Sequence, residues 1–282
     1  MEADNLLTLA DENKMPPQVG FGTYLINKQD EMDAAVKTAF EAGYRLFDTA
    51  QMYRNEQVLA AALNHNGIAR QDVFITDKVA NENQGYELTV ASVDFSLEQL
   101  GTDYIDLMLV HWPINTKFFD TWRALEDVKK AGKVKSIGGV SNYNRAMLEL
   151  LKTQATEMPV VNQIENHPYL TSQGLVDYDH AEEIVTQAWS PLGRGAVLDN
   201  PMIQKMADHH DRSVAQIILR WQVQRGLSMI PKSVNPARIK ENLQIFDFEL
   251  SADEMSMLDI LNRNERTGND PEEVYELGHQ YR

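Results

Sequence analysis

The chain has 282 residues, of which 43% are apolar, and 26 basic against 42 acidic side chains give a formal net charge of −16. This length and composition indicate a globular protein with a sizeable core, built as one large domain or two small ones. The absence of cysteine excludes disulfides, thiol nucleophiles, cysteine-ligated zinc and iron–sulfur clusters. The negative charge argues against nucleic-acid binding, because it repels a phosphate backbone.

The chain also lacks the features of an exported or membrane protein. Its first residues, Met1–Asn5, are acidic where a secretory signal is basic. No apolar run approaches the roughly 20 residues that are needed to span a bilayer. We therefore expect a cytoplasmic protein without a membrane segment.

Short apolar runs alternate with helical patterns along the chain. The first helical pattern spans residues 32–40 and stops at Gly43, and another spans residues 86–100 and stops at Gly101. The run Ile105–Val110 is apolar almost throughout, which is typical of a strand covered on both faces. The predicted strands are Val19–Gly22, Leu46–Asp48, Val73–Lys78, Ile105–Val110, Val134–Val140, Val160–Glu165, Ile184–Trp189 and Leu227–Ile230.

This alternation predicts an α/β fold with a parallel sheet. About eight strand–helix units fit a (β/α)8 TIM barrel, with an open doubly wound sheet as the main alternative. Before the first unit, Leu7–Ala10 and Pro17–Val19 are expected to form a β-hairpin that caps the barrel bottom. No linker divides the chain, so we expect a single domain over residues 1–282, with a short C-terminal substrate loop at about residues 262–282.

Four polar residues lie at or just beyond the C-terminal ends of predicted strands, where a barrel places its active site. They are an acid, a phenol, an ammonium and an imidazole: Asp48, Tyr53, Lys78 and His111. A nearby ammonium is expected to lower the pKa of the phenol from about 10 and so make it a general acid–base. Each residue also has a non-catalytic interpretation: a turn or cap for Asp48, a structural loop residue for Tyr53, a solvated charge for Lys78 and a satisfied buried imidazole for His111.

Seven motifs carry a resemblance to a known family. They lie in order between about Val19 and Phe248, and they are Phe47–Glu56, Ile75–Lys78, Leu109–Pro113, Ile137–Asn142, Val161–Glu165, Ser190–Gly193 and Ile230–Val234. Together they resemble the aldo-keto reductases, and most closely the short prokaryotic reductases of the 2,5-diketogluconate reductase type. The resemblance implies a (β/α)8 barrel that binds NADP(H) without a Rossmann fold, which agrees with the absence of G-x-G-x-x-G from the chain.

The resemblance also implies roles for the four polar residues. Tyr53 is expected to donate the proton, Lys78 to tune its pKa, and Asp48 to pair with Lys78. His111 is expected to orient the substrate carbonyl. The physical logic agrees, since hydride attack on a carbonyl creates an alkoxide that an oriented pair of donors stabilises.

Cofactor residues follow from the same resemblance. The nicotinamide amide is expected at Ser141, Asn142 and Gln163, and its ring against Trp189. The Gly-rich stretch that begins at Ser190 and Leu192 resembles the pyrophosphate belt of the family. The residues implied around the adenosine and its 2′-phosphate are Lys232, Ser233, Val234, Arg238, Glu241 and Asn242. Basic residues beside a helix start, in a protein this acidic, favour NADP over NAD.

Departures from the family pattern concern the substrate. Ala80 stands where many relatives carry Trp, which predicts a wider pocket unless a neighbour such as Met52 fills the space. Tyr24 and Trp112 are the other expected substrate contacts. We expect no metal site, and His209-His210-Asp211 is interpreted as a polar stretch before a helix, because adjacent histidines rarely share a ligand face.

The leading hypothesis is therefore an NADPH-dependent, monomeric enzyme that reduces aldehydes and ketones to alcohols. The carbonyl substrates considered are keto sugars, dicarbonyls and small or bulky ketones. One alternative is a nucleotide-sensing regulatory subunit on the same fold. Another is a hydrolase or aldolase in which Lys78 forms a Schiff base.

Overall fold

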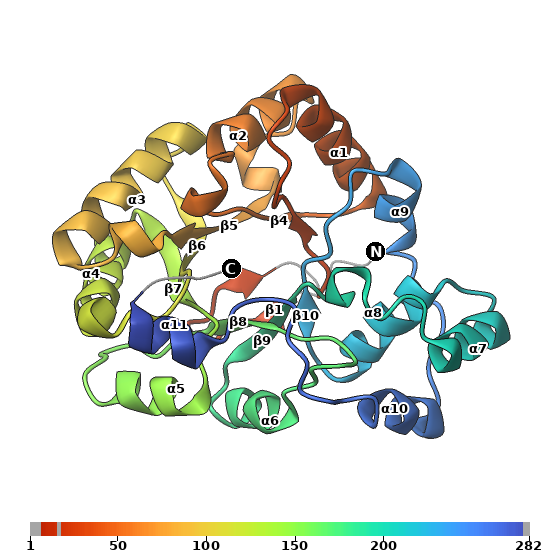
Figure 1. Cartoon of the computed structure of the whole chain (residues 1–282). Coiled ribbons are helices and arrows are strands. Elements are labelled where there is room, and N and C mark those ends of the chain that lie inside the picture. The colour runs from red at the N-terminus through yellow and green to blue at the C-terminus, as the bar shows by residue number, and fades with distance from the viewer. Residues whose placement is uncertain (1–6, 16–17, 279–282) are drawn as a thin grey trace.

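The computed structural model describes residues 7–15 and 18–278, and it has one parallel sheet surrounded by helices (Figure 1). The eight strands of this sheet are neighbours in chain order. They are β3 (Phe21–Gly22), β4 (Leu46–Asp48), β5 (Phe74–Val79), β6 (Ile105–Val110), β7 (Val134–Ser141), β8 (Val161–Glu165), β9 (Val185–Trp189) and β10 (Ser228–Met229). Every strand predicted from the sequence overlaps one of these, and β4, β5, β6 and β8 are buried along their whole length.

The two edge strands of this series meet, so the sheet closes into a barrel. Val19 forms a parallel bridge with Met229, and the Gly20 amide donates to the Met229 carbonyl at 2.8 Å. The Met229 amide in turn donates to the Gln18 carbonyl at 2.6 Å. These bonds exclude the open doubly wound sheet and confirm the predicted (β/α)8 barrel.

Helices follow the strands and form the outer layer. They are α1 (Gln29–Ala42), α2 (Glu56–His65), α3 (Tyr86–Leu100), α4 (Phe118–Lys130), α5 (Arg145–Lys152), α6 (Gln173–Ala181), α7 (Pro201–His210), α8 (Val214–Gln224), α9 (Pro236–Glu241), α10 (Ala252–Asp259) and α11 (Pro271–Leu277). Helices α1 and α3 end at Gly43 and Gly101, as predicted, and both glycines adopt the left-handed conformation that favours glycine. None of the helices in the described ranges is long and apolar enough to cross a bilayer.

A two-stranded hairpin precedes the barrel, but its second strand is not the predicted one. β1 (Leu7–Thr8) pairs antiparallel with β2 (Lys14–Met15). The prediction of Pro17–Val19 is wrong at Val19, since barrel closure pairs that residue with Met229, and Pro17 lies outside the described residues. Met15 is buried, and Asn13 donates to the Lys135 carbonyl at 3.1 Å near the start of β7, so the hairpin covers the bottom of the barrel.

The predicted C-terminal substrate loop contains a helix. Within residues 262–278 the chain forms α11, and residues 279–282 lie outside the described residues. Val274 of α11 is fully buried in a cluster with Trp112 and Ile114, which follow β6. The C-terminal segment is thereby packed beside the end of a central strand.

Candidate active site

The four predicted catalytic residues come together beyond β4, β5 and β6. Asp48 ends β4, Lys78 lies near the end of β5, and His111 directly follows β6. Tyr53 ends a short 3₁₀ helix, Gln51–Tyr53, in the connection after β4. Parallel strands in a closed barrel carry their carboxyl ends to one rim, which is why residues 63 positions apart in the sequence become neighbours.

Lys78 is the centre of this group. Its side chain is completely buried, and Nζ lies 2.5 Å from Asp48 Oδ1 and 2.7 Å from the Thr49 carbonyl. The third contact of Nζ is the Tyr53 hydroxyl oxygen at 3.5 Å. An ammonium has three donors and no acceptor, so these contacts use its full capacity and fix its position.

Asp48 is held by a second donor from across the barrel. Gln163 Nε2 donates to Asp48 Oδ2 at 2.8 Å and also lies 2.7 Å from Gln187 Oε1. Burial raises the pKa of the Asp48 carboxyl, while Lys78 and then Gln163 act to lower it. A buried ion pair needs such additional hydrogen bonds, since Coulomb attraction alone seldom compensates for desolvation.

The structure corrects the expected direction of the Tyr53 pKa. Burial raises the pKa of the phenol well above 10, and the nearby Asp48 charge raises it further. Lys78 does not reverse this, because its charge is compensated by Asp48 at 2.5 Å, a full ångström closer than the phenol. Tyr53 is therefore protonated at neutral pH, as a proton donor must be.

His111 completes the group as a neutral imidazole. Its ring centroid lies 5.6 Å from that of Tyr53, edge to face. Burial lowers the pKa of His111 well below 6.5, and the charge of Lys78 lowers it further. Its Nδ1 atom is buried without a hydrogen-bond partner among the described residues.

The residues predicted for the nicotinamide amide surround the next two strand ends. Ser141, Asn142 and Gln163 are all buried. Asn142 adopts φ 68°, in the left-handed region that asparagine tolerates better than most residues. Its Nδ2 donates to the Ser141 hydroxyl at 2.9 Å, and its Oδ1 accepts from Trp189 Nε1 at 2.8 Å.

Trp189 connects the predicted cofactor and substrate residues. Its ring centroid lies 6.5 Å from that of Trp112. Ser190 and Leu192, in the belt that follows it, are half-buried, and Ser190 has a positive φ of 47°. The predicted nicotinamide wall therefore borders the predicted substrate wall.

The substrate residues divide into two kinds. Tyr24 is 49% exposed, and its ring lies 5.0 Å from that of Tyr53, so it stands at the mouth of the site. Ala80 is only 1% exposed, and its amide donates to Gln51 Oε1 at 2.9 Å. Ala80 thus lines little open surface, which does not support the wider pocket that we expected there.

The residues predicted around the adenosine phosphate are set apart from this buried group. They lie after β10 and on α9, whose first turn is capped by Asn235 Oδ1. Lys232 and Arg238 are exposed, and within the described ranges neither forms an ion pair. Ser233 is half-buried and Val234 is exposed, while Glu241 and Asn242 at the end of α9 are half-buried and buried.

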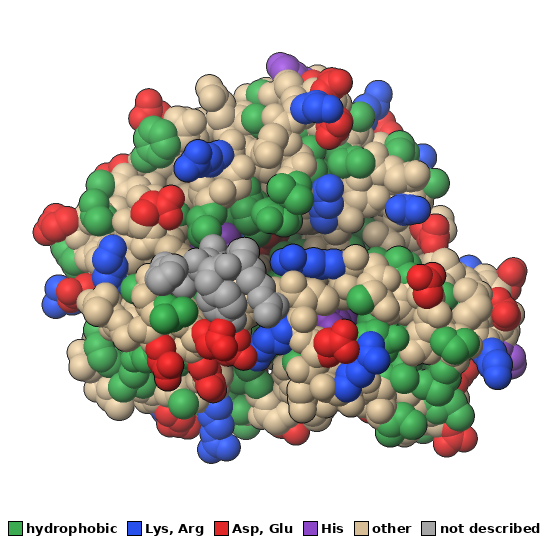
Figure 2. Space-filling view, viewed as in Figure 1, with side chains coloured by type: hydrophobic (Ala, Val, Ile, Leu, Met, Phe, Trp, Pro, Cys, Tyr) green, Lys and Arg blue, Asp and Glu red, His purple; other side chains and the backbone are tan. Residues whose placement is uncertain are grey.

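Figure 2 draws the face of the molecule seen in Figure 1 with its side chains coloured by type. Figure 2 shows hydrophobic side chains gathered just above the centre of this face, with basic side chains bordering them. Acidic side chains lie farther out and below the centre. Although the chain has a net charge of −16, this basic border offers an anion a favourable place to bind.

Sequence reasoning missed one residue that organises the site. Glu165, at the end of β8, is buried and accepts from the Thr267 amide at 2.6 Å and the Gly268 amide at 3.2 Å. A Cβ on Gly268 would lie 2.4 Å from the Trp189 ring, so the backbone there packs directly on the indole. Glu165 thereby fastens the C-terminal segment over Trp189. Its position in the motif Val161–Glu165, at a strand end, was the available signal.

The sequence of the chain is similar to a known family and to characterised proteins. Residues 18–263 match the model of the Aldo/keto reductase family. The chain is 47% identical over 258 residues to a glyoxal reductase of Bacillus subtilis, covering 92% of this chain and 93% of that protein.

Solved structures agree with the sequence comparison. A Gox0644 mutant in complex with NADPH superposes with a TM-score of 0.90 at 39% identity, covering 96% of this chain and 98% of that one. An aldo-keto reductase of Bombyx mori in complex with NADP gives a TM-score of 0.88 at 34% identity, covering 96% and 97%. With the barrel, the buried Lys78–Asp48 pair and the adjacent phenol and imidazole in place, the family resemblance of the motifs is confirmed, and the chain belongs to the aldo/keto reductase family.

Proposed function

We propose that this chain reduces small aldehydes and α-dicarbonyls of the glyoxal type, with Tyr53 as the proton donor. At the coarser level, it is an NADP-dependent oxidoreductase that reduces carbonyl compounds with NADPH, as its family membership and its relatives in complex with NADPH and NADP indicate. The proposed role of Tyr53 rests on one observation above the others. The Lys78 ammonium contacts Asp48, the Thr49 carbonyl and the Tyr53 hydroxyl together.

The residues suit the cofactor that the family uses. Buried amide and hydroxyl groups at Asn142, Ser141 and Gln163 can exchange their present partners for a carboxamide, and Trp189 supplies an aromatic face. Lys232 and Arg238 are cations without an acidic partner among the described residues, as a phosphate site requires. When bound, NADPH supplies the hydride that reduces the carbonyl carbon.

Side chains of the protein supply the proton that the reduction consumes. Tyr53 accepts a hydrogen bond from Lys78, so its own O–H is free to point toward a substrate oxygen. His111, kept neutral by burial, donates from one ring nitrogen to the same oxygen and orients it. As Tyr53 gives up its proton, the ammonium of Lys78 stabilises the phenolate that remains.

The competing interpretation of Lys78 as a Schiff-base lysine loses its support. Such a lysine attacks as a neutral amine, usually after burial beside another cation or in an apolar pocket. Here Nζ is 2.5 Å from the Asp48 carboxylate, which favours the charged ammonium. No observation in the described residues favours the regulatory-subunit alternative over the enzyme.

Two separate observations support the preference for small substrates: the burial of Ala80 and the apolar cluster that follows β6. Ala80 is buried, and in the cluster Trp112, Ile114 and Met52 pack together beside Val274 of α11. The similarity to a glyoxal reductase supports the same choice. We further propose that the protein acts as a monomer in the cytoplasm and binds no nucleic acid.

The test is a panel of carbonyl compounds assayed by oxidation of NADPH and, in parallel, of NADH. We expect glyoxal and methylglyoxal to have a higher kcat/KM than aromatic or branched ketones, and NADPH to be the better donor. A panel in which bulky ketones are preferred would reject the small-substrate proposal. A panel without any carbonyl reduction would reject the enzymatic assignment itself.

A further inference from the structure

The ends of α7 and α10 bring together three potential metal ligands that lie outside the active site. His209 and His210 are the last two residues of α7, and Glu254 lies in the first turn of α10. One ligand atom from each of the three side chains lies within 4.8 Å of the others. Within residues 7–15 and 18–278, this is the one group of at least three such side chains.

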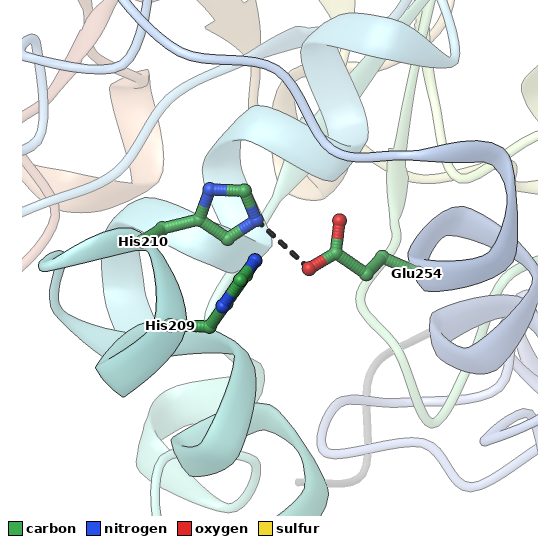
Figure 3. Close-up of side chains that lie close together, drawn as sticks. All are labelled: His209, His210 and Glu254. Carbon is green, nitrogen blue, oxygen red and sulfur yellow. Dashed lines mark hydrogen bonds and ion pairs between the residues drawn. The ribbon is translucent and has the colours of Figure 1, made fainter.

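The side chains converge although the two histidines are adjacent. Consecutive residues on a helix diverge by about 100°, which was our reason for expecting no metal here. Glu254 lies opposite the end of α7, however, and both rings are directed toward its carboxylate (Figure 3). The ring centroids are 5.1 Å apart at an interplanar angle of 77°, so the two imidazoles approach from different directions.

Two of the three ligands are already held in place. His210 Nε2 lies 2.8 Å from Glu254 Oε1, and the His210 ring packs 5.5 Å from Phe248. The other carboxylate oxygen, Oε2, accepts from the amide and the hydroxyl of Ser251 at 2.8 Å each. This capping arrangement orients the carboxylate and leaves Oε1 directed at the histidines, as outer contacts do in metal sites.

We propose that His209, His210 and Glu254 bind a divalent transition-metal ion, with Zn²⁺ as the best match. Two imidazole nitrogens and one carboxylate oxygen are ligands that zinc accepts, whereas calcium and magnesium prefer oxygen alone. Three protein ligands leave a fourth position for water. The ion would replace the direct contact between His210 and Glu254 and link the end of α7 to the start of α10.

The proposed metal ion would stabilise the fold and would take no part in the reaction. Neither α7 nor α10 contributes to the proposed catalytic residues. Helix α10 leads into the C-terminal segment, where Asn262 accepts from the Thr171 amide at 3.1 Å and Thr267 contacts Glu165. A metal at the start of α10 would therefore strengthen the attachment of this part of the chain to the barrel.

The experiment compares zinc binding to the whole protein and its variants after chelator treatment, by calorimetry and by thermal unfolding. The variants are His209→Gln, Glu254→Gln and, as a matched control, His65→Gln. His65 forms a comparable pair with Asp33 at 2.9 Å but has no third ligand in the part of the chain that the structure describes. Glu254→Gln keeps an oxygen for the Ser251 cap, and His209 is exposed, so neither change is expected to unfold the protein.

We expect the parent chain to bind one zinc ion with a rise in Tm of roughly 5 °C at a hundredfold excess over Kd. His209→Gln and Glu254→Gln should each weaken binding by at least about tenfold, and His65→Gln should have no effect. Cobalt(II) should give the intense visible absorption of a four-coordinate site in the parent and lose it in His209→Gln.

Three results would overturn the proposal: no saturable zinc binding, equal affinity in the parent and His209→Gln, or an equal loss in His65→Gln. The first would reduce the cluster to an ordinary hydrogen bond between His210 and Glu254. The second would limit the site to two ligands. The third would assign the binding to scattered surface histidines. None of these readouts depends on the proposed carbonyl reduction.

Discussion

The two ends of the proposed cofactor site differ in how their charges are treated. At the catalytic end, Lys78 is fully buried and paired with Asp48. At the other end, Lys232 and Arg238 are exposed and make no ion pair within the described residues. Both ends use basic residues, and both lie at the rim where the strands of the barrel terminate.

This difference in burial indicates the role of each basic residue. A charge that must act on one atom at a fixed place benefits from complete desolvation and full hydrogen bonding, because little reorganisation then accompanies the reaction. A charge that must capture an anion from water has to be accessible and without an internal partner. Buried basic residues should therefore control turnover, and exposed ones should control affinity.

Tyr53→Phe should have the largest effect and the most selective one. Without the phenolic proton, kcat should fall by roughly 10²- to 10⁴-fold, which is the usual contribution of general acid–base catalysis. NADPH affinity should remain within about twofold, because the ring and its packing are retained. Steady-state assays measure the loss of kcat, and stopped-flow fluorescence measures the affinity for NADPH.

Tyr24→Phe is the matched control, since Tyr24 is the neighbouring phenol at the mouth of the site. It should keep kcat. Near-parental turnover in Tyr53→Phe would remove that residue from its role as the proton donor.

Arg238→Ala should show the opposite selectivity. Loss of a charged hydrogen-bonded contact costs about 1.5–3 kcal/mol, or roughly 10- to 100-fold in affinity for NADPH. NADH binding should change little, because NADH lacks the additional phosphate, and kcat at saturating NADPH should be preserved. Titration of both cofactors measures the difference.

Lys240→Ala, an exposed cation on the same helix, is the control for Arg238→Ala and should leave the preference unchanged. An equal loss of NADPH and NADH affinity in Arg238→Ala would mean that this residue does not contact the 2′-phosphate.

Ala80→Trp tests whether the catalytic end of the site has space for a larger side chain at position 80. Because Ala80 is 1% exposed, an indole there should overpack the region and lower the free energy of unfolding by about 1–3 kcal/mol. Activity on small and bulky carbonyls should then fall together. A stable variant that loses bulky ketones alone would restore the wider pocket that the sequence predicts. Denaturant unfolding and the substrate panel decide between these outcomes.

The smallest predicted effect is a pH dependence of stability caused by His111. Its folded pKa lies well below the unfolded value of about 6.5, so below that pH the unfolded chain binds a proton that the folded chain rejects. Stability therefore falls as the pH decreases from about 6.5, by roughly 1 kcal/mol over the first unit. His111→Asn should flatten this slope relative to the parent in denaturant unfolding at pH 5.5–7.5, and an unchanged slope would contradict a buried neutral His111.

The sequence identified the barrel and its catalytic rim because both depend on local patterns. Apolar runs such as Ile105–Val110 become strands wherever both faces are covered, and Gly43 and Gly101 end helices by adopting positive φ. Once parallel strands alternate with helices, their carboxyl ends share one rim. The placement of Asp48, Lys78 and His111 at the ends of successive strands therefore already brings these residues together.

Other features were decided only by contacts between distant parts of the chain. Closure of the barrel pairs Val19 with Met229 rather than with the hairpin, and burial determines the pKa of Tyr53. His210 meets Glu254 across 44 residues, and Glu165 holds Thr267 across 102. Periodicity and motif spacing describe neighbours along one element, whereas these contacts depend on which elements the finished barrel places side by side.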